Sequence, residues 1–565
     1  MITKIDRREN GWFLNEERLL GIDIESVKHY RQECYWANKT LGDVIEEAAI
    51  KWPERIAVVC GDKRVSYKEL NILSTRLALG FFELGLKPHD MVAVQLPNTL
   101  EHALTILALG KIGAVCNTIG PIMREKEVTY ILNHCKSKAI IIPHEYHKFN
   151  HYTMIQNIAS HIPSLELLIG VGDTAPEGGV QFKTLLEGSL KKDYPSDFLK
   201  SYKPNPDDLS LIGFTSGTTA LPKAYMHTHN TELINAFNGT IPNAYAFLRK
   251  PCINIALPGF AWMFGRWCNF LAGVLTGVTN VTVDPLTPEN ILDTFKRERP
   301  THMHGAPPLY HSTVDGLLSL EKSEIANLEM LHYSGSVIPS ELARKLRRLA
   351  PLVTSYGSSE IGSIVSMTVL DPPYAQIYAS GRPAWGNKVA IADTEGSRLG
   401  TGEEGEIVVK GPGLMLGYFN NPEANAQAFR GDGFFKTGDM GFFDEYGYLH
   451  VTGRIKDVVD RGGYKFSARE VEELILSHPK VKDAGIVGMP DEKLGERGCA
   501  FVVLREHEAL KLEELVAFLK AKGLATFKLP ERLEIVEALP YTPTGKMQKY
   551  ILREQITKVL QDRGA

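Results

Sequence analysis

A loop rich in small hydroxyl side chains is the part of the sequence best suited to bind an anion. It reads Thr215-Ser-Gly-Thr-Thr-Ala-Leu-Pro-Lys223 and follows the short apolar run Leu209 to Phe214. Such small side chains let backbone N–H groups approach an anion closely, while the hydroxyls add donors and the lysine adds charge. An ordinary polar turn is the alternative. We predict a phosphate-binding loop whose contacts come from Thr215, Ser216, Gly217, Thr218, Thr219 and Lys223.

The loop lacks the pattern of P-loop NTPases. That pattern needs a second glycine followed by Lys and then Ser or Thr. Here Ala220 and Ala224 flank Leu221-Pro222-Lys223, and no such triplet follows. A P-loop kinase or ATPase is therefore a poor fit, whereas polyphosphate binding is still expected.

Four later segments carry side chains that suit a magnesium–nucleotide complex. Tyr356 beside a glycine offers a flat face for a purine, and a hydroxyl next to the Glu360 carboxylate suits Mg²⁺, which prefers oxygen ligands. Asp439 follows a tight turn and suits two ribose hydroxyls, and Lys546 stands on a loop stiffened by Pro and Gly. Taken singly, each segment also reads as a turn or a solvated charge run. The segments are Ser355-Tyr-Gly-Ser-Ser-Glu360, Phe435-Lys-Thr-Gly-Asp439, the charged run Gly453 to Lys465, and Pro540-Tyr-Thr-Pro-Thr-Gly-Lys546.

The elements that must position these segments alternate between strand and helix before Gly405. Apolar spacing predicts helices over 41–51, 68–86 and 102–116, and strands over 56–60, 91–96 and 139–142. The alternation recurs from Ile253 to Ser334. It favours βαβ units and parallel sheets.

The pattern of predicted elements changes at Gly405. Short alternating strands broken by glycine turns predict an antiparallel, barrel-like β region, and a compact α+β stretch follows the candidate linker Arg454 to Asp457. The predicted class is therefore α/β: a large N-terminal domain of two βαβ-type sheets plus a β-barrel-like subdomain, and a small α+β C-terminal domain. The predicted boundary separates residues 1–454 from 455–565.

Composition narrows the range of functions. A net charge of −4 and a pI near 6.5 give no global attraction to nucleic acid or to a membrane surface. The seven cysteines are widely spaced and form no Cys-x-x-Cys pair, which indicates a reducing compartment. The first residues lack the apolar segment of a signal peptide, and the apolar run Leu104 to Cys116 is too short to span a bilayer. We expect a cytoplasmic enzyme without a transmembrane segment or a nucleic-acid partner.

Taken together, in this order and at these distances, the segments resemble one known family. The chain is similar along essentially its whole length to the adenylate-forming superfamily of acyl-CoA synthetases, firefly luciferase and peptide-synthetase adenylation domains. It looks most like the medium-chain fatty-acid, alicyclic and aryl acid–CoA ligases. Three of its runs are typical of them: Ser467-Ala-Arg-Glu-Val-Glu472, Leu494-Gly-Glu-Arg-Gly-Cys-Ala500 and Phe527-Lys-Leu-Pro530.

The resemblance implies a two-step reaction with ATP, Mg²⁺ and coenzyme A. A carboxylate attacks the α-phosphate to give an acyl-adenylate and pyrophosphate, and a thiol then displaces AMP. Residues 1–454 would bind AMP and residues 455–565 would be mobile; both monomer and homodimer are left open. In the roles that the resemblance implies, Thr215 to Lys223 bind the β- and γ-phosphates, and Gly335, Ser336 and Tyr356 contact the adenine. Ser359 contacts the α-phosphate, Glu360 binds Mg²⁺, and Asp439 and Arg454 bind the ribose. Lys546 is catalytic, Lys456 is the hinge, and Gly463 leaves room for the pantetheine arm.

The sequence departs from the family pattern in a few places. Ala220 and Ala224 stand where glycine is usual, so those positions cannot adopt a positive φ without strain. Ser359 replaces the commoner threonine and keeps the hydroxyl. Ser355 stands where an amide or acid often meets the adenine amino group, which leaves that contact open.

The segment Leu257 to Trp267 corresponds to the stretch that shapes the acyl pocket in this family. Its aromatic residues predict an apolar wall, with core packing as the alternative. Gly357 stands where acetyl-specific relatives carry a blocking tryptophan, so we expect an acid longer than acetate. Arg266 suits either a polar acid tail or solvent, and a metal pair at His302 and His304 is disfavoured because no carboxylate or thiol is near in sequence. The aromatic residues are Phe260, Trp262, Phe264 and Trp267.

Three functions compete at this point. An acid–CoA ligase acting on a medium-chain, alicyclic or aryl acid is favoured. An acyl- or aryl-AMP ligase that loads a carrier-protein thiol is the second, although the pocket segment lacks the usual polar contacts to a hydroxyaryl ring. A catalytically silent nucleotide-binding protein is the third. The presence of Lys546, Glu360 and Asp439 argues against this function.

Overall fold

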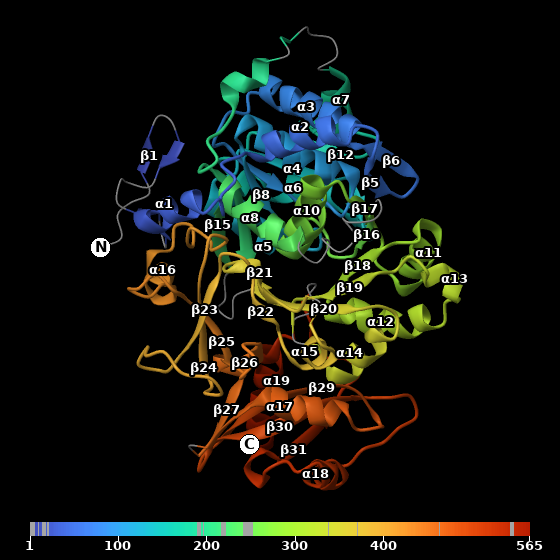
Figure 1. The fold of residues 1–565 in the computed structure, drawn as a ribbon, viewed down its shortest axis with the longest axis vertical. Helices are drawn as coiled ribbons and strands as arrows, with labels where there is room; N and C mark the ends of the chain where they lie inside the picture. The colour runs from blue at the N-terminus through green and yellow to red at the C-terminus, as the bar shows by residue number, and fades with distance from the viewer. Residues whose placement is uncertain are drawn as a thin grey trace.

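The computed structural model describes most of the chain. The described residues are 6–8, 11–13, 18–19, 22–188, 194–195, 197–215, 222–240, 252–336, 338–369, 371–462, 464–542 and 547–564. Figure 1 shows a large N-terminal part with a smaller C-terminal lobe below it. None of the described helices is both long and apolar enough to cross a membrane.

A seven-stranded sheet forms the first half of the N-terminal domain. Its order is β13-β12-β9-β7-β8-β14-β15, and all neighbours are parallel except β14 and β15. The strands are β7 (Met91–Val94), β8 (Val115–Thr118), β9 (Ala139–Pro143), β12 (Leu167–Val171), β13 (Val180–Gln181), β14 (Leu209–Thr215) and β15 (Lys223–Thr228).

A nine-stranded sheet forms the second half, in the order β22-β21-β20-β19-β18-β16-β17-β5-β6. Its central strands are parallel, and its edges are antiparallel hairpins. The strands are β5 (Ile56–Cys60), β6 (Lys63–Ser66), β16 (Ile253–Ala256), β17 (Thr279–Thr282), β18 (His302–Gly305), β19 (Met330–Tyr333), β20 (Leu352–Ser358), β21 (Gly362–Met367) and β22 (Arg382–Pro383).

Buried helices join the two sheets into one core. Helix α4 (Leu100–Ile112) is apolar on all sides and buried almost throughout, as expected for a helix enclosed by protein. Its residues share a hydrophobic cluster with Val92 of the first sheet and Val58 of the second. Helices α2 (Leu41–Lys51) and α3 (Tyr67–Glu83) pack against it and begin at capping boxes formed by Thr40 with Asp43 and Ser66 with Glu69.

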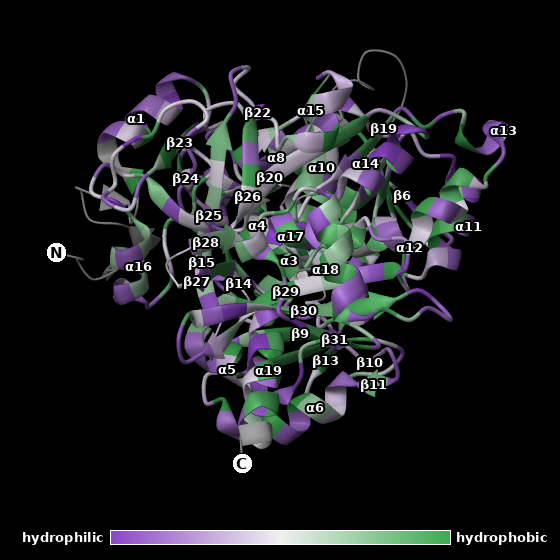
Figure 2. Cartoon of the chain, turned by 90° about the horizontal axis from the view of Figure 1, so that it is seen from below, coloured by the Kyte–Doolittle hydropathy of each residue, from purple (hydrophilic) through white to green (hydrophobic). Residues whose placement is uncertain are grey.

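Of the remaining helices of the N-terminal domain, α8, η4 and α10 are largely buried, and the outer faces carry helices such as α11, α13 and α14. Figure 2 shows hydrophobic residues concentrated in the inner strands and hydrophilic ones on outer helices such as α13. The other helices are α1 (Ile24–Gln32), α5 (Glu125–Cys135), α6 (His151–Ile158), α7 (Phe182–Gly188), α8 (His229–Thr240), the π-helix η4 (Phe264–Leu271), α10 (Ala272–Thr276), α11 (Pro288–Glu298), α12 (Pro307–Leu318), α13 (Lys322–Ile325), α14 (Ser340–Arg347), α15 (Pro373–Tyr378) and α16 (Pro422–Ala428).

The antiparallel β region predicted to start at Gly405 starts earlier, with β23 at Lys388. Its four strands lie in the order β23-β24-β25-β26 and form a sheet rather than a closed barrel among the described residues. They are β23 (Lys388–Ala392), β24 (Gly405–Lys410), β25 (Phe435–Phe443) and β26 (Leu449–Arg454).

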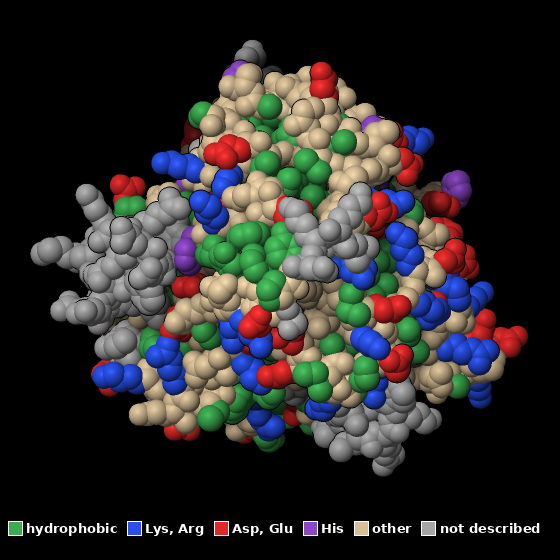
Figure 3. Space-filling model, turned by 90° about the horizontal axis from the view of Figure 1, so that it is seen from above, with side chains coloured by type: hydrophobic (Ala, Val, Ile, Leu, Met, Phe, Trp, Pro, Cys, Tyr) green, Lys and Arg blue, Asp and Glu red, His purple; other side chains and the backbone are tan. Residues whose placement is uncertain are grey.

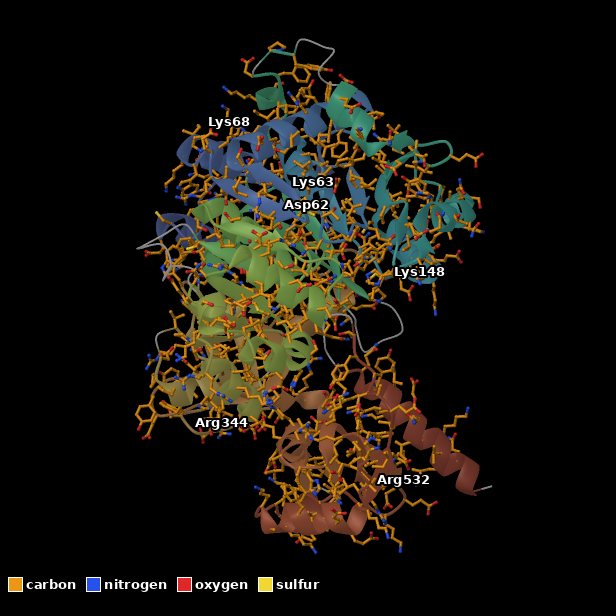
Figure 4. All side chains as sticks on the ribbon, turned by 90° about the vertical axis from the view of Figure 1, so that its right-hand side faces the viewer. Asp62, Lys63, Lys68, Lys148, Arg344 and Arg532 are labelled. Carbon is orange, nitrogen blue, oxygen red and sulfur yellow. The ribbon has the colours of Figure 1, made fainter. Side chains whose placement is uncertain are left out.

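The C-terminal lobe is α+β and has its own hydrophobic cores. In Figure 4 this lobe, with Arg532, lies beyond Arg344, and Asp62 and Lys68 lie toward the opposite end of the molecule. Its elements are β27 (Val458–Arg461), β28 (Tyr464–Ser467), α17 (Ala468–Leu476), β29 (Val481–Asp491), β30 (Gly495–Leu504), α18 (Leu512–Ala521), β31 (Arg532–Ile535) and α19 (Lys549–Gly564). The fold class predicted from the sequence is confirmed; the boundary at 454/455 stays a prediction.

One predicted helix was too long. The apolar run 102–116 is a helix only to Ile112, because Gly113 adopts a left-handed φ of 71° that ends it. Val115 and Cys116 then enter β8, which pairs with β7 and β14.

Surface charges of both signs are mixed, and the cysteines are not paired in disulfides. Figure 3 shows Lys and Arg side chains interspersed with Asp and Glu over the face seen from above, in keeping with the small net charge. All seven cysteines are free thiols, and five of them are buried.

Candidate active site

The ends of the predicted phosphate loop are held together by an antiparallel strand pair. Thr215 at the end of β14 lies opposite Lys223 at the start of β15, and the Thr215 hydroxyl donates to the Lys223 carbonyl at 3.4 Å. The Lys223 ammonium lies 5.1 Å from the centroid of the Tyr418 ring. Ser216, Gly217, Thr218 and Thr219 lie outside the described residues, as does Ala220.

Strand β15 connects this loop to Ser359. Alternate residues of a strand share one face, and on this face Tyr225 and His227 follow Lys223. The Tyr225 hydroxyl shares a hydrogen bond with the Ser359 side chain. The His227 Nε2–H donates to the Ser359 carbonyl at 2.8 Å. Burial lowers the pKa of His227 to about 4, so the imidazole is neutral at pH 7.

Tyr225 and His227 were not predicted from the sequence to belong to the site. Their signal was the alternate spacing of Lys223, Tyr225 and His227 directly after the phosphate loop. This spacing alone could not predict a contact with Ser359, because Ser359 is 132 residues away from His227.

Glu360 lies beside the same cluster. The Tyr418 hydroxyl donates to Glu360 Oε1 at 3.5 Å, and the Met415 N–H donates to the Glu360 carbonyl at 2.8 Å. Burial and the neighbouring Glu360 carboxylate both raise the pKa of Tyr418. Mg²⁺ in nucleotide sites often takes one or two carboxylates and fills its shell with phosphate oxygens and water. A single carboxylate near Lys223 fits that donor set; the described residues contain no group of three or more His, Cys, Asp or Glu side chains placed to hold a metal ion.

Tyr356 meets Asp439 and Arg454 although it lies 83 residues from Asp439 in the sequence. The Tyr356 hydroxyl donates to Asp439 Oδ2 at 2.8 Å, and Arg454 Nε lies 3.3 Å from Asp439 Oδ1. The last two residues lie opposite each other on β25 and β26. Burial and the Asp439 carboxylate raise the pKa of Tyr356 well above its usual value. The three residues form a part-buried polar group in which a carboxylate is oriented from two sides.

Gly335 and Ser336 follow β19 after the buried Ser334 and are exposed. Gly335 has a φ of 103°, a conformation that favours glycine, and a β-carbon there would meet no atom within 4 Å. The backbone at this point is therefore open to a planar ligand.

Of the four predicted aromatic pocket residues, two are partly exposed and two are buried. Trp262 lies against Gly120, where a β-carbon would come within 2.9 Å of the indole ring. Phe264 starts the π-helix η4. Phe260 is fully buried in the core and packs on His102 and Phe270, with ring centroids 6.0 and 5.0 Å away. The prediction that Phe260 lines an open wall is therefore corrected: it packs in the core, as does Trp267.

Arg266 neither reaches an acid tail nor faces solvent. Its side chain is fully buried and forms a two-point ion pair with Glu232 of α8, with Nε–Oε2 at 2.5 Å and Nη2–Oε1 at 3.0 Å. Ser210 and Trp267 also donate to this carboxylate. Burial alone would raise the pKa of Glu232, but Arg266 holds it below its usual value.

The neighbouring backbone also favours a glycine at position 357, in addition to the room for the acid that was predicted from the sequence. A β-carbon at this position would come within 2.4 Å of the carbonyl oxygens of Gly362 and Ser363, across the β20–β21 hairpin. Any side chain here would require the hairpin to shift.

The predicted hinge lies between β26 of the antiparallel sheet and β27 of the C-terminal lobe. Lys456 is in the short helix η5 (Ile455–Asp457), and Arg553 of α19 donates to the Lys456 carbonyl at 2.8 Å and to the Asp457 carboxylate at 3.1 Å. Desolvation, followed by the nearby Arg454 cation, lowers the pKa of Lys456 to about 8. Gly463 and Lys546 lie outside the described residues.

A surface pocket of about 480 Å³ lies apart from these residues. It is formed between α1, the β22–β23 connection and β24, and contains none of the predicted site residues. Its lining residues include Glu25, His29, Tyr35, Lys388 and Lys410.

Comparisons with known proteins match nearly the whole chain. The family model described as AMP-binding enzyme matches residues 45–419, and that described as AMP-binding enzyme C-terminal domain matches residues 470–546. The chain is 34% identical over 546 residues to the medium-chain fatty-acid–CoA ligase of Escherichia coli (strain K12), which covers 94% of this chain and 93% of that one. It is 33% identical over 541 residues to the 2,3-dihydroxybenzoate-AMP ligase of Bacillus subtilis (strain 168), covering 95% and 97%.

A solved structure has the same fold. The crystal structure of the anthranilate CoA ligase AuaEII in complex with anthranoyl-AMP superposes with a TM-score of 0.82 at 22% sequence identity, covering 93% of this chain and 98% of that one.

Proposed function

The chain belongs to the AMP-binding enzyme family of adenylate-forming acid–thiol ligases, and on that premise we propose that it converts a medium-chain, alicyclic or aryl carboxylic acid to its acyl-CoA thioester. ATP, Mg²⁺ and coenzyme A are the proposed co-reactants. The observation that carries the proposal is the meeting of Tyr356, Asp439 and Arg454. An oriented carboxylate next to an aromatic ring suits the ribose and base of a nucleotide.

The nucleotide's phosphates are proposed to lie between Lys223 and Glu360. Lys223 supplies positive charge at one side, and the Ser359 hydroxyl and Glu360 carboxylate are fixed at the other by β15 and Tyr418. When bound at Glu360, Mg²⁺ would neutralise phosphate charge. Phosphoryl chemistry needs positioning and charge neutralisation more than covalent help, and these residues offer both.

The proposed reaction has two steps. The acid's carboxylate oxygen bonds to the α-phosphorus while the bond from that phosphorus to pyrophosphate breaks. The thiol of coenzyme A then bonds to the acyl carbon, its proton leaves to solvent, and AMP departs. Lys546 is proposed to bridge the acid and the α-phosphate in the first step, and movement of the C-terminal lobe about Lys456 is proposed to bring Gly463 to the thiol for the second.

The acid is proposed to lie against Trp262 and Phe264. Both aromatic side chains are partly exposed, and the neighbouring Gly120 leaves room for the Trp262 ring. The named acids of the two relatives, a medium-chain fatty acid and 2,3-dihydroxybenzoate, both bear an apolar body that such a wall would contact. Seven free thiols suit a reducing compartment such as the cytoplasm.

A carrier-protein thiol is the alternative acceptor, since the Bacillus subtilis relative is named an AMP ligase. The test is to supply ATP, Mg²⁺ and a panel of acids with either coenzyme A or a phosphopantetheinylated carrier protein, and to identify the thioester by mass spectrometry. The proposal expects acyl-CoA. Thioester on the carrier alone would assign the second function, and no thioester with either acceptor would contradict both.

A further inference from the structure

The two flanks of the segment that carries Lys546 are joined to each other. The Gln548 N–H donates to the Pro540 carbonyl at 2.8 Å. Next to this bond, Tyr541 and Met547 pair in an isolated antiparallel bridge. Lys546 directly precedes Met547 in the sequence, so contacts that fix Met547 also limit where the backbone of the lysine can lie.

A carboxylate of the C-terminal lobe holds the first flank. The Tyr541 hydroxyl donates to Asp483 of β29, at 2.9 Å from Oδ2 and 3.1 Å from Oδ1. The Ala484 N–H donates to the same carboxylate at 2.9 Å. Burial raises the pKa of Tyr541, as does the Asp483 carboxylate, so the phenol keeps its proton at pH 7. A hydrogen bond to a charged acceptor is stronger than one between neutral groups.

An ion pair holds the second flank to the same lobe. The Lys549 ammonium lies 2.7 Å from Glu472 Oε1, and the two side chains are only 11% and 13% exposed. Glu472 belongs to α17 and also accepts from the Ile486 N–H of β29 at 2.7 Å. Both charges are largely removed from water, so loss of one partner would leave the other unpaired at a high cost.

Met547 lies against β29 between these two ties. A β-carbon at Gly485 would come within 2.6 Å of the Met547 sulfur, so a glycine here allows the close approach. Met547 also packs against the hydrophobic core that contains Val487. One short stretch of β29, from Asp483 to Ile486, therefore contacts both flanks.

The tied flank lies near the candidate nucleotide site. Tyr541 is close enough to Tyr333, the last residue of β19, for the two phenols to interact electrostatically. Gly335 and Ser336, which the family resemblance assigns to the adenine, follow shortly after Tyr333. The ties therefore fix the flank on the side of the lobe where Lys546 would be needed.

We propose, building on the adenylate-forming function above, that these two ties position Lys546 for the first step of the reaction. The four side chains that form them, Asp483, Tyr541, Glu472 and Lys549, make up a clasp. The clasp contacts neither the acid nor ATP and acts through the lysine. A flexible lysine side chain loses freedom when it must meet charge at one point, and a fixed backbone lowers that cost in advance.

The experiment measures the two half-reactions separately in Tyr541→Phe and Lys549→Met. Exchange of labelled pyrophosphate into ATP, with the acid that the wild-type protein uses best, reports the first. Conversion of the supplied acyl-adenylate and coenzyme A to acyl-CoA reports the second. Exchange should fall by roughly tenfold to a hundredfold, as expected for a displaced catalytic group, while acyl-CoA formation keeps the wild-type rate. Lys549→Arg retains the cation and should recover part of the exchange.

A double-mutant cycle with Lys546→Ala tests whether the clasp acts through the lysine. Groups that act as a unit give strongly non-additive losses. Adding Tyr541→Phe to Lys546→Ala should therefore cost little further exchange. Losses that multiply in the double variant would overturn the inference, because the clasp would then act independently of Lys546.

Tyr550→Phe and Lys528→Met are the matched controls. Tyr550 is exposed, and its hydroxyl accepts from the Gln548 side chain at 3.2 Å. Lys528 lies 2.6 Å from Glu470, which is on the same helix as Glu472 but in a more exposed pair. Both controls should keep the wild-type exchange rate. Thermal unfolding of every variant checks the fold.

The outcomes separate this inference from the function on which it rests. Absence of exchange in the wild-type protein with every acid would overturn the proposed function and this inference with it. Exchange in the wild-type protein that is unchanged in both clasp variants would overturn the inference alone, as would equal losses in the two half-reactions. If Lys549→Met does not fold, Tyr541→Phe decides the matter, since it removes only a hydroxyl group.

Discussion

Asp439 connects two side chains of the candidate nucleotide site that come from different sheets. It accepts from Tyr356 of β20 at 2.8 Å and lies 3.3 Å from Arg454 of β26. Sequence alone singled out all three residues through the family resemblance. Their contact could not be seen in the sequence, because Tyr356 and Asp439 are 83 residues apart.

Asp439→Asn should raise the KM for ATP by roughly tenfold or more. The change removes a charged acceptor, and hydrogen bonds to charged groups are worth about 1.5–3 kcal/mol. Steady-state kinetics and calorimetric binding of AMP measure the effect. Asp432→Asn, in a turn of the same β region where Asp432 pairs with Arg430, is the control. An unchanged KM for ATP in Asp439→Asn would remove Asp439 from the site.

His227 positions Ser359 without touching a substrate in this account. Its Nε2–H donates to the Ser359 carbonyl at 2.8 Å inside the protein. His227→Leu should leave that carbonyl unpaired, at a cost of about 1–3 kcal/mol, and should lower kcat more than it raises the KM for ATP. His227→Gln retains an N–H donor and should recover part of kcat. Equal losses in both variants, tracking a lower melting temperature, would indicate a purely structural role.

At the level of elements, one buried ion pair ties the acid-pocket helix to its neighbour. Arg266 of η4 and Glu232 of α8 are both fully buried, and Ser210 and Trp267 complete the carboxylate's hydrogen bonds. Breaking a buried pair on one side leaves an uncompensated charge, which typically costs about 3–5 kcal/mol.

Arg266→Met alone should therefore lower the free energy of unfolding by about 3–5 kcal/mol. The double variant Arg266→Met, Glu232→Leu should recover much of the loss, since neither charge then remains in the core. Urea denaturation of the four proteins of this cycle measures both values. Additive losses in the double variant would mean that the two side chains do not act as a pair.

The elements were easier to predict than the directions of their side chains. Helix α2 and strand β5 have the bounds that apolar spacing predicted, Leu41–Lys51 and Ile56–Cys60. Phe260 and Arg266 could not be placed, because the spacing of residues before and within the π-helix η4 does not say which side chains face the core. Arg266 also depends on Glu232, a partner 34 residues away that no motif marks.

On the scale of the whole molecule, burial lowers the pKa of histidines in the described core, most strongly in six of them. Desolvation lowers the pKa of each below 6.5: His102, His227, His229 and His302 to about 4, His332 to about 3 and His304 well below the usual value. They lie in both halves of the N-terminal domain, so their protonation affects the stability of its whole core.

Stability should fall as the pH drops below about 6.5. The unfolded chain then binds protons that the folded core excludes, so the stabilisation present above the unfolded pKa is lost as pH falls toward the folded pKa values near 4. Each histidine contributes up to about 1.4 kcal/mol per pH unit. Denaturation midpoints between neutral and mildly acidic pH measure the slope. The double variant His302→Leu, His332→Leu should show a shallower slope, and an identical slope would mean that these two side chains are not excluded from protonation.

Acid-dependent exchange of labelled pyrophosphate into ATP tests the central claim most directly, because it reports formation of an acyl-adenylate before any thiol is added. The account predicts that exchange requires Mg²⁺ and a carboxylic acid, proceeds without coenzyme A, and falls by roughly 10²–10³ in Lys546→Ala, the expected loss for one preorganised charged group. Exchange that is independent of added acid, or AMP binding without any exchange across the acid panel, would contradict it.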